Sequence, residues 1–189
     1  MGSIATSGGY MASIASDYII AYNGTLTGSI GVLMQSPEVT ELAQKIGVKF
    51  NTYKSSPLKG SPSPFEKPNA EVNKVINEAI SDSYKFFVDM VLSKRADRIL
   101  PNVRKNVFDG RVFTGRQALK VGLIDKIGDK QDALAYLATK NIDIKKLKVE
   151  EVKITEEENN FLNKIFGVKN FFEDFSLNHS GSRIMAVFH

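Results

Sequence analysis

The residues best placed to do chemistry lie in the sequence ATSGGY at positions 5–10. A serine followed by two glycines, directly before an apolar helical pattern, is typical of a nucleophile on a tight turn. The glycines tolerate strained dihedral angles and let a substrate approach the backbone closely. A helix that begins after Ser7 directs free N–H groups toward developing negative charge. Such a turn needs a preceding strand, for which the sequence supplies only residues 1–5.

A serine nucleophile also needs a general base. The only histidines, His179 and His189, lie in a weakly patterned C-terminal stretch, so a Ser-His-Asp triad is not expected. A lysine can act instead when its amine is neutral. With an unperturbed pKa of about 10.4, about one lysine in a few thousand is neutral at pH 7. Burial in an apolar cleft lowers that pKa by about 3–5 units and makes a lysine a workable base.

Lys59 is the lysine that its surroundings favour. It lies in the loop PLKGSPSPF, whose prolines would hold it rigid and partly desolvated, and residues 53–63 include no acid that would keep it charged. The alternative is an ordinary exposed loop lysine, which is the more frequent case when this argument stands alone.

The composition is that of a globular domain rather than a nucleic-acid-binding or membrane-spanning chain. Of the 189 residues, 42% are hydrophobic and 24% charged, and the net charge of +4 comes from basic residues interleaved with acids. The absence of cysteine excludes disulfides, thiolate metal sites and cysteine catalysis. No apolar run approaches the roughly 18 residues of a membrane span, and no signal peptide is present. The chain as given is therefore expected to be soluble.

The elements that must position these residues alternate between strands and helices. Strands are expected at 17–21, within 25–34, and at 48–53, 123–127 and 147–154. Helices are expected directly after Ser7 and at 36–46 (with Ser36 as N-cap), 69–94, 101–107, 114–120 and 130–139. The glycines that interrupt 25–34 are typical of a close approach by a ligand or another backbone. The alternation predicts an α/β domain with a largely parallel sheet.

The domain limits follow from the same pattern. Residues 1–155 are assigned to the catalytic α/β domain, and residues 156–189 to a C-terminal tail rich in phenylalanine. Because so much exposed aromatic surface is unusual on a monomer, the tail is expected to pack on the domain or on a neighbouring subunit. The helix at 69–94 carries apolar residues at the 3.6-residue spacing of one buried face.

Four motifs together resemble the signal peptide peptidase A family: ATSGGYMAS, GTLTGSIGV, the loop lysine and DGRVFTGRQALKVGLIDKIG. They occur in the family's order over residues 1–138, and Ser7 and Lys59 are 52 residues apart, as the family's nucleophile and base are. The resemblance implies a membrane-associated serine protease that uses a Ser/Lys dyad. It also implies a Clp/crotonase-like fold, a repeated β-β-α superhelix.

The family's roles transfer to particular residues of this sequence. Ser7 matches the nucleophile, Lys59 the general base, and Gly8 the residue whose N–H is one oxyanion donor. Ser29 matches a serine whose hydroxyl hydrogen-bonds the lysine, and a hydroxyl can orient a neutral amine without adding charge. Ser29 also fits a strand residue with a satisfied hydroxyl. Other matching positions are interpreted as scaffold: Gly110, Arg111, Thr114, Gly115, Arg116, Gly122 and Asp125.

The sequence departs from the family's pattern ahead of Ser7. The resemblance implies a membrane anchor, several βα units and a glycine-rich loop with the second oxyanion donor, and none of these is present. The chain is therefore interpreted as an N-terminally incomplete portion of such a protein. The parent protein is expected at the cell membrane, with its catalytic domain outside the cytoplasm.

The resulting hypothesis is a serine endopeptidase that hydrolyses cleaved signal peptides or other short apolar peptides through an acyl-enzyme. It needs no metal or other cofactor, binds no nucleic acid, and contacts a membrane only through the missing anchor. The resemblance also implies a homo-oligomer with sites shared between protomers. Two alternatives stay open: an inactive, peptide-binding assembly module, and a crotonase-fold acyl-CoA enzyme. The second is disfavoured because that chemistry relies on carboxylates and a backbone oxyanion hole rather than on a serine.

Overall fold

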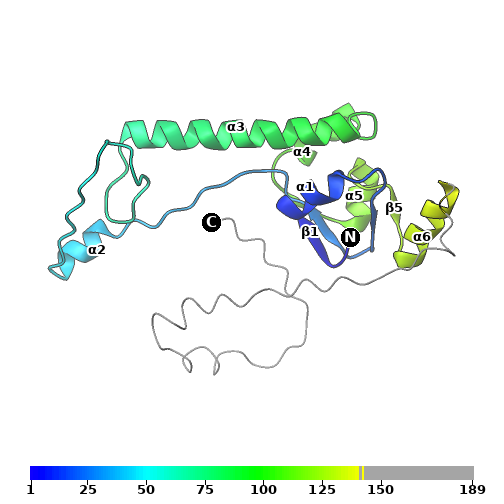
Figure 1. Cartoon of the computed structure of the whole chain (residues 1–189), viewed down its shortest axis with the longest axis horizontal. Coiled ribbons are helices and arrows are strands. Elements are labelled where there is room, and N and C mark those ends of the chain that lie inside the picture. Colours follow the sequence, from blue (N-terminus) through cyan, green and yellow to red (C-terminus); the bar gives the residue numbers. More distant parts are fainter. Residues whose placement is uncertain (141, 143–189) are drawn as a thin grey trace, which may run out of the picture. The chain divides into compact units, whose positions relative to one another are not determined.

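The computed structural model describes residues 1–140 and 142, and residues 1–133 form one compact unit. Its strands are short: β1 (Ile4–Thr6), β2 (Ile20–Ala21), β3 (Leu26–Gly28), β4 (Val112–Thr114) and β5 (Lys126–Ile127). The helices of the described residues are α1 (Gly8–Ile14), α2 (Thr40–Lys45), α3 (Ala70–Arg95), α4 (Arg104–Val107), α5 (Gly115–Val121) and α6 (Lys130–Thr139), with a 3₁₀ turn at Pro101–Val103 (Figure 1). The predicted α/β class is confirmed. The predicted limits at 155 and 156 fall outside the described residues.

Two small sheets hold the strands together. In the first, of order β1-β3-β4, β1 pairs with β3 in parallel and β3 pairs with β4 antiparallel. In the second, β2 and β5 are parallel. The hydroxyl of Thr27, which is fully buried, donates to the Ala5 carbonyl at 2.8 Å and adds a side-chain bond to the β1–β3 ladder. The register pairs Thr6 with Gly28, so the residues that follow β1 and β3 are neighbours.

The core lies where α1, α5 and the C-terminal half of α3 meet the strands (Figure 1). Its members are Tyr10, Ile14, Ile19, Ala21, Ile30, Phe87, Val91, Ile99, Val107, Phe113, Ala118, Leu123 and Ile124. Burial of each large apolar side chain contributes about 1.5–3 kcal/mol. The predicted single buried face of α3 is only partly present. Phe87 and Val91 are completely buried, whereas Val75, nearer the N-terminal end, is 44% exposed.

Several helix ends match their sequence signals. The Asn69 side chain accepts the Val72 N–H at 2.9 Å and begins α3. Thr114 and Gln117 form a reciprocal capping box at the start of α5, which satisfies two N–H groups that the helix leaves free. Gly122 ends α5 with φ 85°, and a Cβ there would lie 2.2 Å from the Arg98 carbonyl oxygen. Only glycine fits that position.

The segment between β3 and α3 departs from prediction. The helix expected at 36–46 with Ser36 as N-cap is wrong at its start, because α2 begins at Thr40 and the Ser36 hydroxyl donates to the Pro37 carbonyl instead. The Glu38 carboxylate accepts the Thr40 N–H at 2.7 Å and supplies the polar group at the helix start.

The strand expected at 48–53 is also wrong. In the part of the chain that the structure describes, no strand pairs with these residues. The Val48 N–H instead donates to the Ala43 carbonyl at the end of α2. The strands expected at 17–21, 25–34 and 123–127 are present in shortened form, and the one expected at 147–154 lies outside the described residues.

Candidate active site

Ser7 is the single residue between β1 and α1. Its backbone has φ 50° and ψ −117°, a conformation that costs a non-glycine residue about 1–3 kcal/mol and is concentrated at functional sites. The Ser7 N–H donates to the Gly28 carbonyl at 2.8 Å, and the Ser7 carbonyl accepts from the N–H groups of Tyr10 and Met11. The hydroxyl does not cap the helix. A strand of three residues is therefore enough to build the expected strand–turn–helix, and it leaves the hydroxyl available.

Gly8 begins α1 and is partly exposed. The first N–H groups of a helix have no acceptor within it, and among residues 1–140 no hydrogen bond takes the Gly8 N–H. The position suits a donor to an oxyanion formed beside Ser7. That role for Gly8 stays a prediction.

Ser29 lies directly beyond β3, as Ser7 lies beyond β1. The parallel register therefore makes the two serines neighbours. They are also the only non-glycine residues with positive φ in the described part of the chain, at 50° and 53°. The Ser29 N–H donates to the Arg111 carbonyl at 2.8 Å, so the turn before β4 holds this residue in place. The structure thus brings together two of the predicted site residues.

Gly28 connects the two serines, and sequence reasoning gave it no role of its own. Its φ is 78°, and a Cβ there would lie 2.7 Å from Cδ2 of Phe113. The same close packing recurs at Gly31, where a Cβ would lie 3.2 Å from the Gly110 Cα. The glycines that interrupt residues 25–34 are the sequence signal for this close packing. The segment that packs against them is the chain's own residues 110–113.

Lys59 lies in a different environment. It belongs to an exposed turn in which its N–H donates to the Ser56 carbonyl at 3.1 Å. An ion pair between Lys54 and Glu66 spans the loop around it. In the described residues no hydrogen bond or ion pair joins Lys59 to Ser7 or Ser29. The partial burial suggested by the flanking prolines is absent from this chain on its own, and the role of Lys59 as base stays a prediction.

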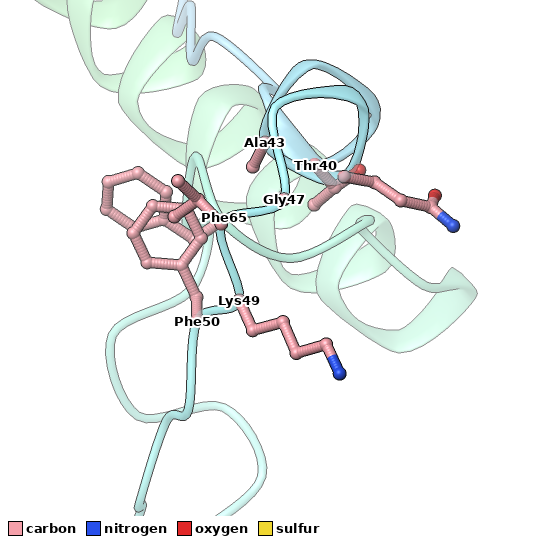
Figure 2. Close-up of a pocket in the computed structure, with 8 residues that line it drawn as sticks. Thr40, Ala43, Gly47, Lys49, Phe50 and Phe65 are labelled. Carbon is pink, nitrogen blue, oxygen red and sulfur yellow. The ribbon is translucent and has the colours of Figure 1, made fainter.

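A pocket of about 310 Å³ lies in the segment that precedes α3 (Figure 2). Phe50 and Phe65 stack at one side of it, with ring centroids 3.9 Å apart, and Lys49 extends away from the rings. The remaining lining residues are Thr40, Ala43, Gln44, Gly47 and Val48. None of the predicted site residues lines this pocket, so it is separate from the serine turn.

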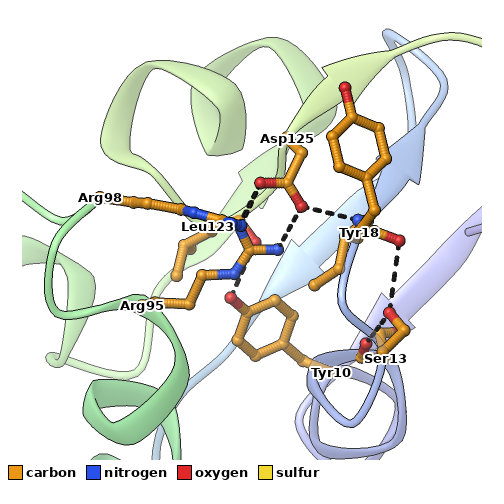
Figure 3. Close-up of polar contacts among 9 residues, drawn as sticks. Tyr10, Ser13, Tyr18, Arg95, Arg98, Leu123 and Asp125 are labelled. Atoms are coloured by element: carbon orange, nitrogen blue, oxygen red, sulfur yellow. Dashed lines mark hydrogen bonds and ion pairs between the residues drawn. The ribbon is translucent and has the colours of Figure 1, made fainter. Parts of the chain in front are cut away.

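A buried ion pair joins Arg95, at the end of α3, to Asp125 (Figure 3). Arg95, only 2% exposed, donates to both carboxylate oxygens of Asp125 at 2.7 and 2.8 Å, and the Ile19 N–H adds a third bond at 2.7 Å. Burial opposes ionisation of Asp125, but these hydrogen bonds outweigh it and hold its pKa below the ordinary value. Burial raises the pKa of Tyr10, whose hydroxyl donates to the Leu123 carbonyl at 2.8 Å. Sequence reasoning missed Arg95, which has the sequence context of a solvated helix end.

Two other features, a metal site and a membrane-spanning helix, concern the described residues. Across residues 1–140 and 142, no group of three or more histidine, aspartate or glutamate side chains is placed to hold a metal ion. Within the same residues, no helix has both the length and the apolar character that crossing a membrane requires.

Comparison with known proteins identifies a peptidase family. The model of "Peptidase family S49" matches residues 1–145. Over 133 residues the chain is 44% identical to "Putative signal peptide peptidase SppA" of Enterococcus faecium, covering 70% of this chain and 38% of that protein. It is 38% identical to "Putative protease slr0021" of Synechocystis, covering 73% and 49%. It is 34% identical to "Serine protease SPPA, chloroplastic" of Arabidopsis thaliana, covering 77% and 22%. The chain therefore spans less than half the length of each of these relatives.

A solved structure similar to this chain is an enoyl-CoA hydratase/isomerase family protein from Hyphomonas neptunium. The two share 18% identity with a TM-score of 0.34, over 92% of this chain and 53% of that one. This likeness is too low to support an argument. The family match agrees with the Clp/crotonase-like α/β fold that the sequence motifs imply.

Proposed function

This chain belongs to peptidase family S49, and from that premise we propose that it carries the nucleophile of a serine endopeptidase. The observation that carries the proposal is the geometry of Ser7. Its strained backbone lies between a strand and a helix, its N–H and carbonyl are both bonded, and its hydroxyl takes no part in capping. Strain held at one serine by its surroundings is what an exposed nucleophile on a turn requires.

The proposed reaction uses a Ser/Lys dyad. The Lys59 amine removes the Ser7 Oγ proton as Oγ attacks a peptide carbonyl. The Gly8 N–H bonds the oxyanion that forms, and the loss of such a donor typically lowers the rate by about 10²–10³. The peptide C–N bond then breaks, the leaving amine takes the proton from the Lys59 ammonium, and an ester on Ser7 remains. Water activated by the lysine hydrolyses the ester, while the Ser29 hydroxyl orients the amine.

The position of Lys59 supports a site shared between protomers. Lys59 is exposed and has no described contact with Ser7. The surrounding segment exposes large apolar side chains, among them Leu33 at 76%, Ile46 at 68% and Tyr53 at 94%. We therefore propose a homo-oligomer in which Lys59 of one protomer reaches Ser7 of the next. Contact between protomers would cover this apolar surface and desolvate the amine.

The substrate class follows from the relatives and from the sheet. The Enterococcus relative's name refers to signal peptides, so the proposed substrates are cleaved signal peptides or other short apolar segments. An extended peptide adds to a sheet edge through main-chain hydrogen bonds. A parent protein at the cell membrane, with this domain outside the cytoplasm, would meet such peptides where they are released.

The dyad is tested by covalent labelling. A fluorophosphonate should label the chain at Ser7, located by peptide mass spectrometry, and both Ser7→Ala and Lys59→Ala should abolish the adduct. A version extended at its N-terminus with the relatives' preceding sequence is labelled in parallel. Persistent labelling of Lys59→Ala would remove Lys59 as the base.

The same variants test whether the site is shared. Mixing Ser7→Ala with Lys59→Ala protein should restore part of the labelling, because some interfaces then pair an intact serine with an intact lysine. No recovery after subunit exchange, verified with differently tagged copies, would place both residues in one protomer. If no version is labelled but apolar peptides still bind to Ser7→Ala, the peptide-binding assembly module becomes the better description.

A further inference from the structure

We infer that Tyr10, held through Leu123 by the Arg95–Asp125 pair, is a positioning residue for Ser7. This inference rests on the proposed function, since it assigns a role around the same nucleophile. Tyr10 lies in the first turn of α1 and is completely buried. Its N–H donates to the Ser7 carbonyl at 2.9 Å, and its hydroxyl donates to the Leu123 carbonyl at 2.8 Å. One residue therefore joins the serine turn to a segment more than a hundred positions away.

The segment 123–125 is itself fixed from several sides. The Leu123 N–H donates to the Ala118 carbonyl at 2.9 Å, at the end of α5. Asp125 exchanges two bonds with Ile19, one through its N–H and one through its carboxylate. The same carboxylate accepts hydrogen bonds from both terminal nitrogens of Arg95 in α3. Arg98 forms an ion pair with it as well. The segment that holds the Tyr10 hydroxyl is thus anchored to α5, to Ile19 directly before β2, and to α3 (Figure 3).

The two anchors of the serine turn act on opposite sides of it. On the strand side, the Ser7 N–H is held by the Gly28 carbonyl at 2.8 Å. On the helix side, Tyr10 is the residue that links α1 to the 123–125 segment. Since Ser7 keeps a strained φ of 50°, a loosened helix side lets the turn relax and moves the hydroxyl. A displacement of about 1 Å at a reacting group can lower a rate by about 10².

A buried ion pair is poorly explained by stability alone. Replacing such a pair with well-packed apolar residues is often neutral or stabilising, because both charges lose their hydration on burial. What the pair provides here is a directional set of bonds that fixes where the Leu123 carbonyl lies. The geometry therefore assigns the ion pair a role in orienting the acceptor of the Tyr10 hydroxyl.

The chain offers a matched control for this idea. Tyr84, in α3, also donates its hydroxyl to a backbone carbonyl, that of Phe108, and is partly buried where Tyr10 is completely buried. Tyr10→Phe and Tyr84→Phe each remove one hydroxyl and one tyrosine–carbonyl hydrogen bond. Only the first bond lies on the path to Ser7. The two variants therefore separate loss of a hydrogen bond from loss of positioning.

The experiment measures fluorophosphonate labelling of Ser7 in the full chain at several reagent concentrations, with thermal unfolding in parallel. Both variants should unfold at similarly lowered temperatures. Tyr10→Phe should lower the maximal labelling rate by about tenfold or more while leaving the half-saturating concentration unchanged. Tyr84→Phe should stay within about twofold of the unsubstituted chain on both measures. Equal labelling rates for the two variants would overturn the positioning role.

Two further outcomes are decisive. If neither the unsubstituted chain nor its N-terminally extended version is labelled, or Ser7→Ala is labelled equally, the proposed function fails and the positioning role fails with it. If Tyr10→Phe does not fold, Arg95→Lys replaces it, since a lysine keeps the charge but cannot bond both carboxylate oxygens in the same fork. A lowered maximal labelling rate in folded Arg95→Lys supports the inference, and an unchanged rate overturns it.

Discussion

The serine turn and the segment that carries Lys59 differ in how far the rest of the chain covers and holds them. At the turn, the backbone groups of Ser7 and Ser29 are bonded to β3 and to the turn before β4, and the helix that follows is anchored by a fully buried tyrosine. Between β3 and α3, by contrast, many large apolar side chains are exposed, and the Lys67–Glu41 ion pair lies at the surface. One chain thus holds the proposed nucleophile firmly and presents the proposed base on an exposed loop.

This difference separates two requirements of a dyad. A nucleophile needs a fixed direction, and the described hydrogen bonds of Ser7 supply it within one chain. A lysine base needs a desolvated amine, and nothing described around Lys59 removes it from water. Substitutions at the turn should therefore act on stability and on geometry, whereas substitutions in the Lys59 segment should act on association between chains.

The largest expected effect is at the buried ion pair of the serine region. Arg95→Ala leaves the Asp125 carboxylate buried without its main partner, which should lower the free energy of unfolding by about 3–5 kcal/mol. The contrasting change is Lys67→Ala, which breaks an ion pair with Glu41 whose side chains are 64% and 70% exposed. That pair is screened by water, so the substitution should leave the unfolding free energy unchanged within error. Urea titration measures both, and equal losses would contradict the comparison.

The next effect compares two glycines with almost the same backbone angle. Gly28 has φ 78° and Gly60, in the Lys59 loop, has φ 75°. A Cβ at Gly28 would meet Phe113 at 2.7 Å, whereas nothing lies within 4 Å at Gly60. Gly60→Ala should therefore cost only the left-handed backbone strain of about 1–2 kcal/mol. Gly28→Ala should cost that strain plus about 1–3 kcal/mol of overpacking.

The Gly28 change has a second readout. Because its carbonyl holds the Ser7 N–H, Gly28→Ala should also lower the rate of Ser7 labelling when assayed at a temperature where the variant is folded. A stability loss equal to that of Gly60→Ala would mean that Phe113 moves aside easily and that β3 is less constrained than its contacts indicate.

A smaller effect is expected from pH. The pKa of Asp125 is lowered in the folded chain from its ordinary value of 3.8, so the carboxylate binds protons more readily when the chain is unfolded. Its contribution to stability is therefore complete above that value and is lost as pH falls through 3.8 toward the folded pKa. The chain should lose stability between about pH 5 and 2 more steeply than Asp125→Asn, measured by thermal unfolding. Parallel pH profiles would show that Asp125 has the same pKa in both states.

Local patterns predicted the parts of this molecule whose causes are local. The signals are the glycines after Ser7, the cap at Thr114 and the stop at Gly122. Each acts within a few residues, and the elements they begin or end are present, as is the helix expected from residue 69. The strand expected at 48–53 has suitable residues but no described partner. A strand is stabilised by pairing across a sheet, which a single stretch of sequence does not report.

The rest of the site depends on distant contacts. The neighbouring positions of Ser7 and Ser29 follow from the pairing of Thr6 with Gly28, a register that no local signal specifies. Arg95 has the sequence of a cation at a helix end, where favourable interaction with the helix dipole is the ordinary explanation. Asp125 lies 30 residues later in the sequence, and only the fold brings its carboxylate close enough to pair with a buried Arg95. The motif-based family resemblance supplied the site residues that periodicity did not reveal.

The smallest effect on stability is expected where the largest apolar surface is exposed. Ile46, at the end of α2, is 68% exposed, so Ile46→Ser should change the unfolding free energy of the monomer by less than about 0.5 kcal/mol. If the Lys59 segment is covered by a neighbouring protomer, the same change should lower the oligomer mass measured by light scattering. It should also weaken Ser7 labelling, because it separates the proposed base from the nucleophile without touching either residue. Glu78→Ser, on the exposed surface of α3, is the matched control and should alter neither mass nor labelling. An unchanged mass and rate for Ile46→Ser would mean that this part of the segment stays exposed in the assembly, and that any contact which completes the dyad lies elsewhere.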